Sequence, residues 1–512
     1  MCGTLIGAPP MPAKRILSAA LALLLVAAIP ARATSFPEIY VVDTIWAGTD
    51  SSSALMNSVR FGNYLYFTAT DNSSSWELWR TNGDTTERLK DINLTGDSYP
   101  GNFVAFGNHL YFVADDGVSG REIWRTDGTA SGTTLLKDVW NESSQPGDPA
   151  LSAFGGYLYF AADDGTGDGI ELWRTDGTAN GTALFKEINV ESAEPASSNP
   201  FDFLVAGNYL YFKADDGDHG VELWRTDGTV GGTILVKDIN VGGGNASISP
   251  LAAFGSYVYF AATEEATGSE LWRSNGIESG TTLVKNINLG SAGASDSSPS
   301  SFTVFNNYLY FVADNGVTGQ ELWRTNGTIT TPVADINSTG SSAPYSFGAF
   351  GDWLYFAADD GLSGYELWRT NGTAAGTTLV QEINTGSGGL DSASPDLFTA
   401  LGDYLYFRAN DNGVGKLWRI SGQGEIESRV LPGTNSFIGC QCDRAISVLN
   451  SRLFMVLYSD ETGSEFSYLD EPTFVLPGTN RDGSAWSMAL VILAAVTAVA
   501  GIGLRMRGVR RG

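Results

Sequence analysis

Eight copies of one short motif, regularly spaced along most of the chain, predict an all-β protein built as a β-propeller of eight or nine four-stranded blades. The motif reads ELWRTDGT from Glu171 and again from Glu222, and six further copies differ from it slightly. Intervals of 45 to 51 residues between copies indicate a repeat architecture with room for four short strands per repeat. A β-solenoid is the alternative, although its rungs are normally shorter. The tryptophans that mark the copies are Trp79, Trp124, Trp173, Trp224, Trp272, Trp323, Trp368 and Trp418.

The chain begins with the pattern of a secretory signal peptide. Lys14 and Arg15 precede a mostly apolar run, and a small-residue site follows it. This order predicts cleavage after Ala33, so that residues 1–33 would be removed on export. Met11 is a second candidate start, because the pattern is complete from that residue onward.

Each repeat predicts four short strands bounded by Gly, Asp and Asn. In one second strand, Tyr64 and Tyr66 alternate with Leu65 and Phe67, so both faces carry bulky apolar side chains. Such a sheet needs neighbours on both sides, as blades around an axis provide. The segment EIYVVDTI from Glu38 resembles a fourth strand but precedes the first hairpin. We expect it to complete the last blade and close the ring.

A ninth, degenerate copy follows the eighth. The segment from Arg452 keeps the outline of the hairpin but has Phe466 and Ser467 where other copies have Leu and Trp. Residues 34–480 are therefore predicted to form one propeller domain. The sequence leaves the blade number at eight or nine, because the ninth unit could be a full blade or a shared one.

The end of the chain predicts a membrane anchor. After a short linker at 481–485, residues 486–504 carry no charge and are long enough to cross a bilayer as a helix. Arginines in the tail 505–512 favour a cytoplasmic end, which leaves the acidic body outside. LPGTN from Leu476 resembles a sortase signal with Asn in place of the expected Gly. Because VLPGTN also occurs from Val430, the sequence leaves cleavage of this sorting-type tail open.

Composition narrows the classes of function. The chain is 43% hydrophobic, enough for a core, and its net charge of −27 argues against a nucleic-acid partner. His109 and His219 are the only histidines, which argues against Ser-His-Asp catalysis and against metal sites built from histidine. Cys440 and Cys442 could form a bridge, hold a metal or remain free, and we favour free thiols in a loop.

The Asp of the motif is predicted to form a turn and not to do chemistry. It is Asp127, Asp176 and Asp227 in three copies, but other copies have Asn at this position and a Gly after it. Asp and Asn share a short side chain that bonds nearby backbone, whereas a general base would not normally alternate with an amide.

An arginine follows the motif tryptophan in every copy, which predicts a structural tie. A substrate clamp would be needed only once or twice. We expect each guanidinium to bond a carboxylate or a backbone carbonyl in its own or the adjacent blade, and acids that end the later strand, such as Asp91 and Asp138, are candidate partners. The arginines are Arg80, Arg125, Arg174, Arg225, Arg273, Arg324, Arg369 and Arg419.

Acidic Gly loops between the second and third strands are candidate calcium sites. Clustered carboxylates offer oxygen ligands, but no copy has EF-hand spacing, and the alternative is a solvated hairpin turn. These loops and the variable linkers between repeats should share one rim of the propeller, with the TDGT turns on the other. We expect recognition on the acidic, linker-bearing rim. The candidate ligands are Asp115, Asp116, Asp163, Asp164, Asp215, Asp216, Asp359 and Asp360.

The repeated motif resembles the bacterial ELWxxDGT repeat family, over most of the mature chain. The resemblance implies a secreted or cell-surface location and a repetitive β fold, and it brings no catalytic residues. We therefore expect a non-enzymatic, exported surface protein, an acidic scaffold that binds a surface protein or glycan, with calcium as the only candidate cofactor. The alternatives are a propeller hydrolase or lyase that uses carboxylates, and a structural module of an envelope or matrix.

Overall fold

The computed structural model of the chain confirms an all-β propeller and gives it nine four-stranded antiparallel blades, which excludes the solenoid alternative. One compact unit spans Glu38–Glu471. Several predicted features lie outside the described residues: the signal segment, both LPGTN segments, the apolar segment 486–504, and Cys440 and Cys442. Within the described part of the chain, no helix has the length and apolar character to cross a membrane. The structure describes residues 39–41, 56–70, 75–139, 150–167, 169–190, 197–290, 295–384, 392–430, 446–459 and 463–470.

In each of the first five blades, chain order runs from the innermost to the outermost strand. Blade 1 holds β2 (Met56–Phe61), β3 (Tyr64–Thr70), β4 (Trp76–Thr81) and β5 (Thr86–Lys90). Blade 2 holds β6 (Gly101–Phe106), β7 (His109–Asp115), β8 (Arg121–Thr126) and β9 (Thr134–Lys137). Blade 3 holds β10 (Ser152–Phe154), β11 (Tyr157–Ala162), β12 (Glu171–Thr175) and β13 (Ala183–Lys186). Blade 4 holds β14 (Phe201–Ala206), β15 (Tyr209–Asp215), β16 (Val221–Thr226) and β17 (Ile234–Lys237). Blade 5 holds β18 (Ser249–Phe254), β19 (Tyr257–Glu264), β20 (Gly268–Ser274) and β21 (Thr282–Lys285), with the 3-10 turn η1 (Glu278–Gly280).

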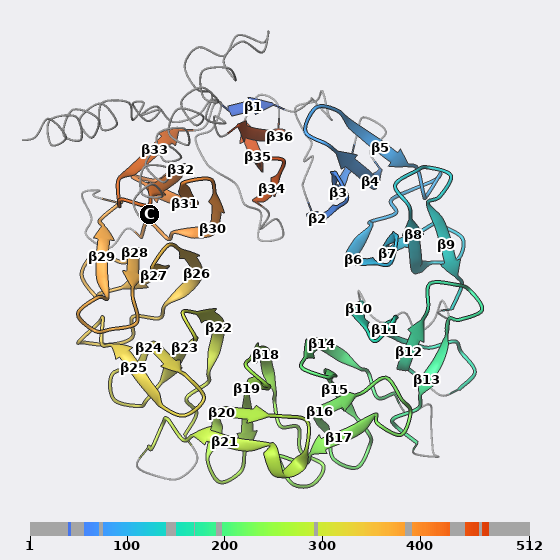
Figure 1. Cartoon of the computed structure of the whole chain (residues 1–512), viewed down its shortest axis with the longest axis horizontal. Coiled ribbons are helices and arrows are strands. Elements are labelled where there is room, and N and C mark those ends of the chain that lie inside the picture. Colours follow the sequence, from blue (N-terminus) through green and yellow to red (C-terminus); the bar gives the residue numbers. More distant parts are fainter. Residues whose placement is uncertain are drawn as a thin grey trace, which may run out of the picture. The chain divides into compact units, whose positions relative to one another are not determined.

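The next three blades repeat this order, and Figure 1 shows the first strand of each blade nearest the axis. Blade 6 holds β22 (Ser300–Phe305), β23 (Tyr308–Asp314), β24 (Gln320–Thr325) and β25 (Thr330–Ala334). Blade 7 holds β26 (Tyr345–Phe350), β27 (Trp353–Asp359), β28 (Tyr365–Thr370) and β29 (Thr378–Gln381). Blade 8 holds β30 (Asp396–Leu401), β31 (Tyr404–Asp411), β32 (Val414–Ser421) and β33 (Ile426–Val430).

Blade 9 joins the two ends of the propeller and confirms the predicted ring closure. Its inner three strands, β34 (Ser447–Leu449), β35 (Arg452–Ser459) and β36 (Gly463–Asp470), come from the degenerate ninth copy, and its outermost strand is β1 (Ile39–Val41). β1 pairs antiparallel to β36, with Ile39 opposite Leu469. The N-terminal segment thus takes the place of a fourth strand, so blade 9 is a full blade.

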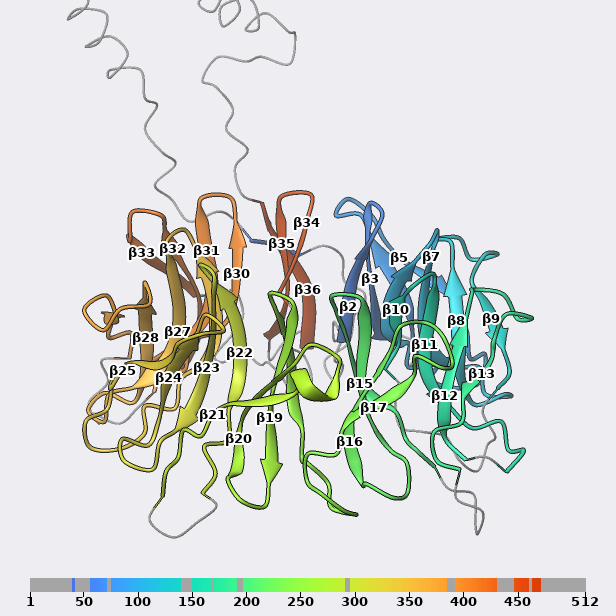
Figure 2. The ribbon, with the colours of Figure 1, turned by 60° about the horizontal axis from the view of Figure 1, so that its bottom comes forward.

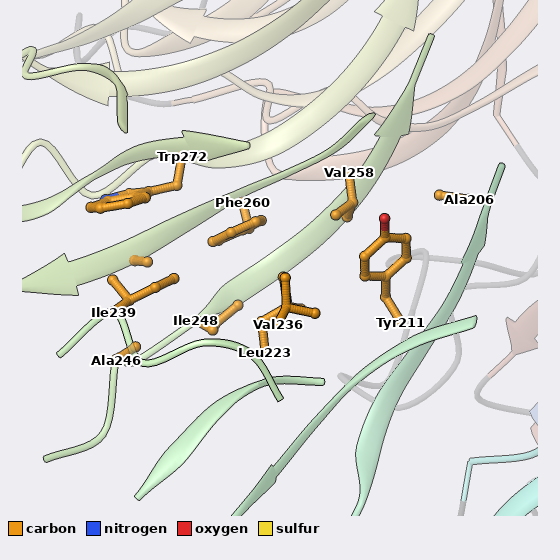
Figure 3. Packing of buried hydrophobic residues seen from close by; sticks show 11 residues of the cluster. Ala206, Tyr211, Leu223, Val236, Ile239, Ala246, Ile248, Val258, Phe260 and Trp272 are labelled. Carbon is orange, nitrogen blue, oxygen red and sulfur yellow. The ribbon is translucent and has the colours of Figure 1, made fainter. Parts of the chain in front are cut away.

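The core lies between neighbouring blades, as sheets that are apolar on both faces require. Figure 3 shows one such cluster, where Tyr211 and Leu223 of blade 4 pack with Val258, Phe260 and Trp272 of blade 5. All five side chains are buried. The alternation in the second strand that predicted this packing is therefore confirmed.

The antiparallel order of the strands gives the propeller two distinct faces (Figure 2). We call one the loop face: it carries the loops between second and third strands and the linkers between blades. The other, the turn face, carries the remaining turns, including TDGT. Six of the linkers contact the second strand of the next blade where its loop begins, as in the hydrogen bond from Asp115 N to Ser98 O at 2.9 Å. The predicted division into two rims is confirmed.

Candidate binding face

The motif Asp shapes the turn on the turn face. Asp176 Oδ1 accepts hydrogen bonds from Thr178 N at 2.9 Å and from Thr178 Oγ1 at 2.7 Å. These bonds lower the pKa of the Asp176 carboxyl. Asn371 Oδ1 accepts the same bond from Thr373 N at 3.1 Å, so an amide serves equally well. The turn interpretation is confirmed.

The motif arginines tie neighbouring blades together through the turn face. Arg125 Nη1 donates to Gly177 O of the next blade at 2.6 Å, and Arg174 Nη1 donates to Gly228 O at 3.0 Å. Most of the guanidiniums also stack on the ring that begins the second strand, as Arg174 does at 4.0 Å from the Tyr157 centroid. The same bond to the next blade's turn glycine is made by Arg80, Arg225 and Arg273.

Blades 8 and 9 modify this tie. Arg419 donates to Glu427 in its own blade at 3.2 Å, because β36 and β1 are not joined by a turn that could accept it. In blade 9 the two partners are exchanged: Arg452 stands where other blades have the ring, and Tyr468 stands where they have Arg. Their stack persists at 4.6 Å, and Arg452 Nη1 reaches Asp84 in the turn of blade 1 at 2.9 Å.

The tryptophans of the motif are buried between blades, except for half-buried Trp368. Their packing explains why they recur in the first eight repeats. Asp91, a candidate partner for a motif arginine, instead faces Arg88 at 3.4 Å. The motif Trp and Arg are thus parts of the scaffold.

The motif glutamate is a structural residue that the sequence reasoning missed. Glu171 accepts hydrogen bonds from Ile188 N at 2.7 Å, Ser198 N at 3.1 Å and Ser198 Oγ at 2.6 Å. It thereby fastens the linker that leads to the next blade. Burial raises the pKa of Glu171 to about 7, although the hydrogen bonds oppose the rise.

The same glutamate recurs in blades 1 to 7. Each of the seven is at most 1% exposed. The signal that could have revealed them is strictness: the turn Asp alternates with Asn, but this position is Glu in seven consecutive copies. The set is Glu77, Glu122, Glu171, Glu222, Glu270, Glu321 and Glu366.

The candidate calcium ligands form turns within their own loops. Asp115 Oδ1 accepts a hydrogen bond from Gly117 N at 2.6 Å, and Asp116 Oδ1 accepts one from Val118 N at 2.9 Å. The pairs from Asp163, Asp215 and Asp359 do the same. Across the described residues, no three His, Cys, Asp or Glu side chains gather closely enough to hold a metal ion. The structure therefore places the candidate ligands in separate loops and does not assemble them.

The loop face carries the most exposed apolar side chains of the described chain. Seven Leu and Val residues are 69 to 87% exposed, more than any other large hydrophobic residue in the described ranges. All seven follow equivalent positions, either the Asn of the linker or the Gly of the loop. They are Leu94, Val118, Val190, Val241, Leu289, Val317 and Leu362.

Two charged pairs beside the axis break the repeat pattern. Lys213 of β15 pairs with Asp202 of the innermost strand β14, and its Nζ also donates to Ile248 O at 2.8 Å. In blade 8, Arg408 Nε donates to Asp396 of the innermost strand β30 at 2.8 Å. A carboxylate enzyme would need a non-recurring cluster of this kind, but here each charge is already compensated by its partner.

No protein-family model matches the chain, and no curated protein does. Several solved structures are similar to it. BamB from Moraxella catarrhalis is 13% identical over 73% of this chain and 95% of its own, with a TM-score of 0.37. A puromycin hydrolase is 12% identical over 73% of this chain and 61% of its own, with a TM-score of 0.36. A puromycin-hydrolyzing peptidase from Mycobacterium tuberculosis is 12% identical over 66% and 54%, with a TM-score of 0.34. The chain thus spans less than two thirds of either hydrolase, and likeness at this level carries no argument about function.

Proposed function

We propose that this chain is an exported, non-enzymatic propeller displayed at a bacterial cell surface, where its loop face binds a surface protein or glycan. One observation carries the proposal: the seven most exposed large apolar residues of the described chain all lie on the loop face. Solvent-exposed apolar side chains that gather on one face are typical of an interaction site. The motif residues, in contrast, are engaged in holding blades together.

The direction of the chain supports display of the loop face. β36 runs from the loop face to the turn face, and β1 begins opposite its end, where Ile39 pairs with Leu469. Both ends of the propeller therefore lie on the turn face. A polypeptide that continues from Asp470 thus starts on the face opposite the loop face.

A binding screen with the full-length chain in mild detergent tests the proposal. Surface proteins and glycans are presented with and without Ca²⁺, and we expect saturable binding to at least one. A loop-face variant, Val190→Ser with Leu362→Ser, should weaken that binding. A turn-face control, Val230→Ser with Ile329→Ser, should not, although both residues are at least half exposed. Equal binding by both variants, self-assembly without any ligand, or turnover of a ligand would each contradict the proposal.

The masses of the mature ends test the export part separately. Removal of residues 1–33 predicts an N-terminus at Thr34. A retained tail predicts an intact C-terminus at Gly512 in the membrane fraction, and processing at the sorting-type motif predicts a shorter end. A mature protein that keeps Lys14 and Arg15 would contradict export by the predicted signal.

A further inference from the structure

We propose that the partner of the loop face is a cationic polypeptide that carries aliphatic side chains between its basic residues. This inference rests on the binding function proposed above and names the chemical class of the ligand. Its basis is the pattern of apolar side chains on that face, and the charge around them selects the partner.

The apolar side chains come in local pairs where a linker meets the loop of the next blade. Asn93 touches the loop at Gly117, since a Cβ added there would lie 2.7 Å from Asn93 Oδ1. Leu94 and Val118 directly follow these two residues, so they stand at one junction. Gly316 meets Asn288 in the same way, with 2.5 Å to Oδ1. This second junction carries the other pair, Leu289 and Val317.

The two pairs belong to distant parts of the ring. The first lies between blades 1 and 2 and the second between blades 5 and 6, which Figure 1 shows on opposite sides of the axis. Single exposed residues stand at other junctions, so the described part of the face offers repeated small apolar contacts. An extended or multivalent chain can engage several of them at once, which raises affinity without new contacts.

Charge determines which polypeptide fits. The loops that carry the apolar side chains also carry carboxylates, and Lys416, a basic group on this face, already pairs with Asp411 at 2.6 Å. A second copy of this face, an anionic membrane or a nucleic acid would meet like charge, whereas a basic partner would be attracted. The carboxylates include Asp116, Asp164, Asp216, Asp218, Glu264, Glu265 and Asp360.

The chemistry of the seven most exposed large apolar residues favours a polypeptide over a sugar. All seven are Leu or Val. Sugar rings are usually bound against the flat faces of aromatic side chains, whereas branched aliphatic groups pack well against the aliphatic side chains of another protein. The face therefore combines small hydrophobic contacts with negative charge, which complements alternating apolar and basic residues.

Two synthetic polymers test the inference on the full-length chain in mild detergent. The first is poly-L-lysine, and the second is a longer lysine–leucine copolymer with the same number of lysines and therefore the same total charge. We expect both to bind, with the copolymer about tenfold tighter, because burying a few partly covered Leu and Val side chains supplies that factor. Added salt should weaken the binding of polylysine more than that of the copolymer.

A matched pair of variants tests whether the preference for the copolymer arises on the loop face. The variant L94S/V118S/L289S/V317S should lose the preference for the copolymer but keep its affinity for polylysine, and V230S/I329S on the turn face should keep both. Circular dichroism checks that each variant is folded. Equal affinities for the two polymers in the unaltered chain would overturn the inference.

The remaining outcomes separate this inference from the function on which it rests. If neither polymer binds while a neutral protein or a glycan binds the loop face, the partner class is wrong and the binding function stands. If no ligand binds the loop face, both are wrong.

Discussion

Blades 1 to 7 place a buried glutamate at the start of the third strand, whereas blade 8 places Lys416 there. The glutamates fasten the linker to the next blade through backbone hydrogen bonds. Lys416 instead pairs with Asp411 of its own hairpin, and Arg419 turns to Glu427 of its own outer strand. Blade 8 thus satisfies these groups inside one sheet. The arginines of blades 1 to 5 also bond the turn glycine of the next blade, and Arg80 additionally pairs with Glu87 of its own sheet. The difference indicates that the arginine tie depends on a turn between the third and fourth strands of the following blade, which β36 and β1 do not share.

The largest effect should come from removing one of the buried glutamates. Glu171→Ala leaves the Ile188 and Ser198 amides without their acceptor and should cost about 3 kcal/mol in free energy of unfolding. Lys416→Ala removes a pair that is partly exposed and should cost less than about 1 kcal/mol. Urea unfolding of the two variants measures the contrast. Equal losses would mean that the glutamate ties have no special weight.

Removing an arginine tie should cause the second-largest loss of stability. Arg174→Ala loses both the bond to Gly228 of the next blade and the stack on Tyr157, and should cost about 2 kcal/mol. Glu427→Gln in blade 8 keeps a neutral acceptor for Arg419 and should cost under about 1 kcal/mol. Thermal unfolding followed by circular dichroism compares them. A larger loss for Glu427→Gln would reverse the comparison between the two regions.

Stability should fall as pH rises, because of the buried glutamates. Burial raises the pKa of Glu171 from 4.5 to about 7, so the folded state holds this proton more tightly than the unfolded state. The contribution of this proton to the free energy of unfolding is complete below about pH 4.5 and is lost as pH rises toward about 7. Glu171→Gln cannot titrate and should remove about 2.5 kcal/mol of the difference in unfolding free energy between pH 5 and pH 8. Melting temperatures at both pH values, with Lys416→Gln as the control, test this. An unchanged pH dependence in Glu171→Gln would be evidence against a raised pKa.

The smallest effect should come from the turn residue that makes the motif recognisable. Asp176→Asn keeps the oxygen that accepts from Thr178, so unfolding free energy should change by no more than about 0.5 kcal/mol. Asp176→Ala removes that acceptor and serves as the comparison. If Asp176→Asn lost as much stability as Asp176→Ala, the charge itself would be needed.

The blades, the two rims and the ring closure could be predicted from the sequence, because each rests on local patterns that repeat. Alternation from Tyr64 to Phe67 determines a two-faced strand, and the likeness of the Glu38 segment to a fourth strand places it in the ring. These features follow from residues within one repeat, so no knowledge of distant contacts was needed.

Contacts between repeats could not be predicted in the same way. The arginine tie was expected to find a carboxylate or carbonyl, but nothing in the spacing indicates that Arg125 meets the turn glycine Gly177 of the next blade. The role of Glu171 was missed because an acid beside a strand normally lies in solvent. The exposure of Leu94 and Val118 depends on how a linker folds over its neighbour, which hydrophobic pattern alone does not indicate.

The pairing of β1 with β36 joins two strands that are synthesised at opposite ends of translation. β1 is the first strand of the ring to be synthesised, and its partner is the last. Blade 9 therefore cannot be completed until every other blade has been made and, for an exported chain, carried across the membrane. Until then β1 lacks the strand with which it pairs in the folded propeller, so it depends on the last part of the chain to cover its edge.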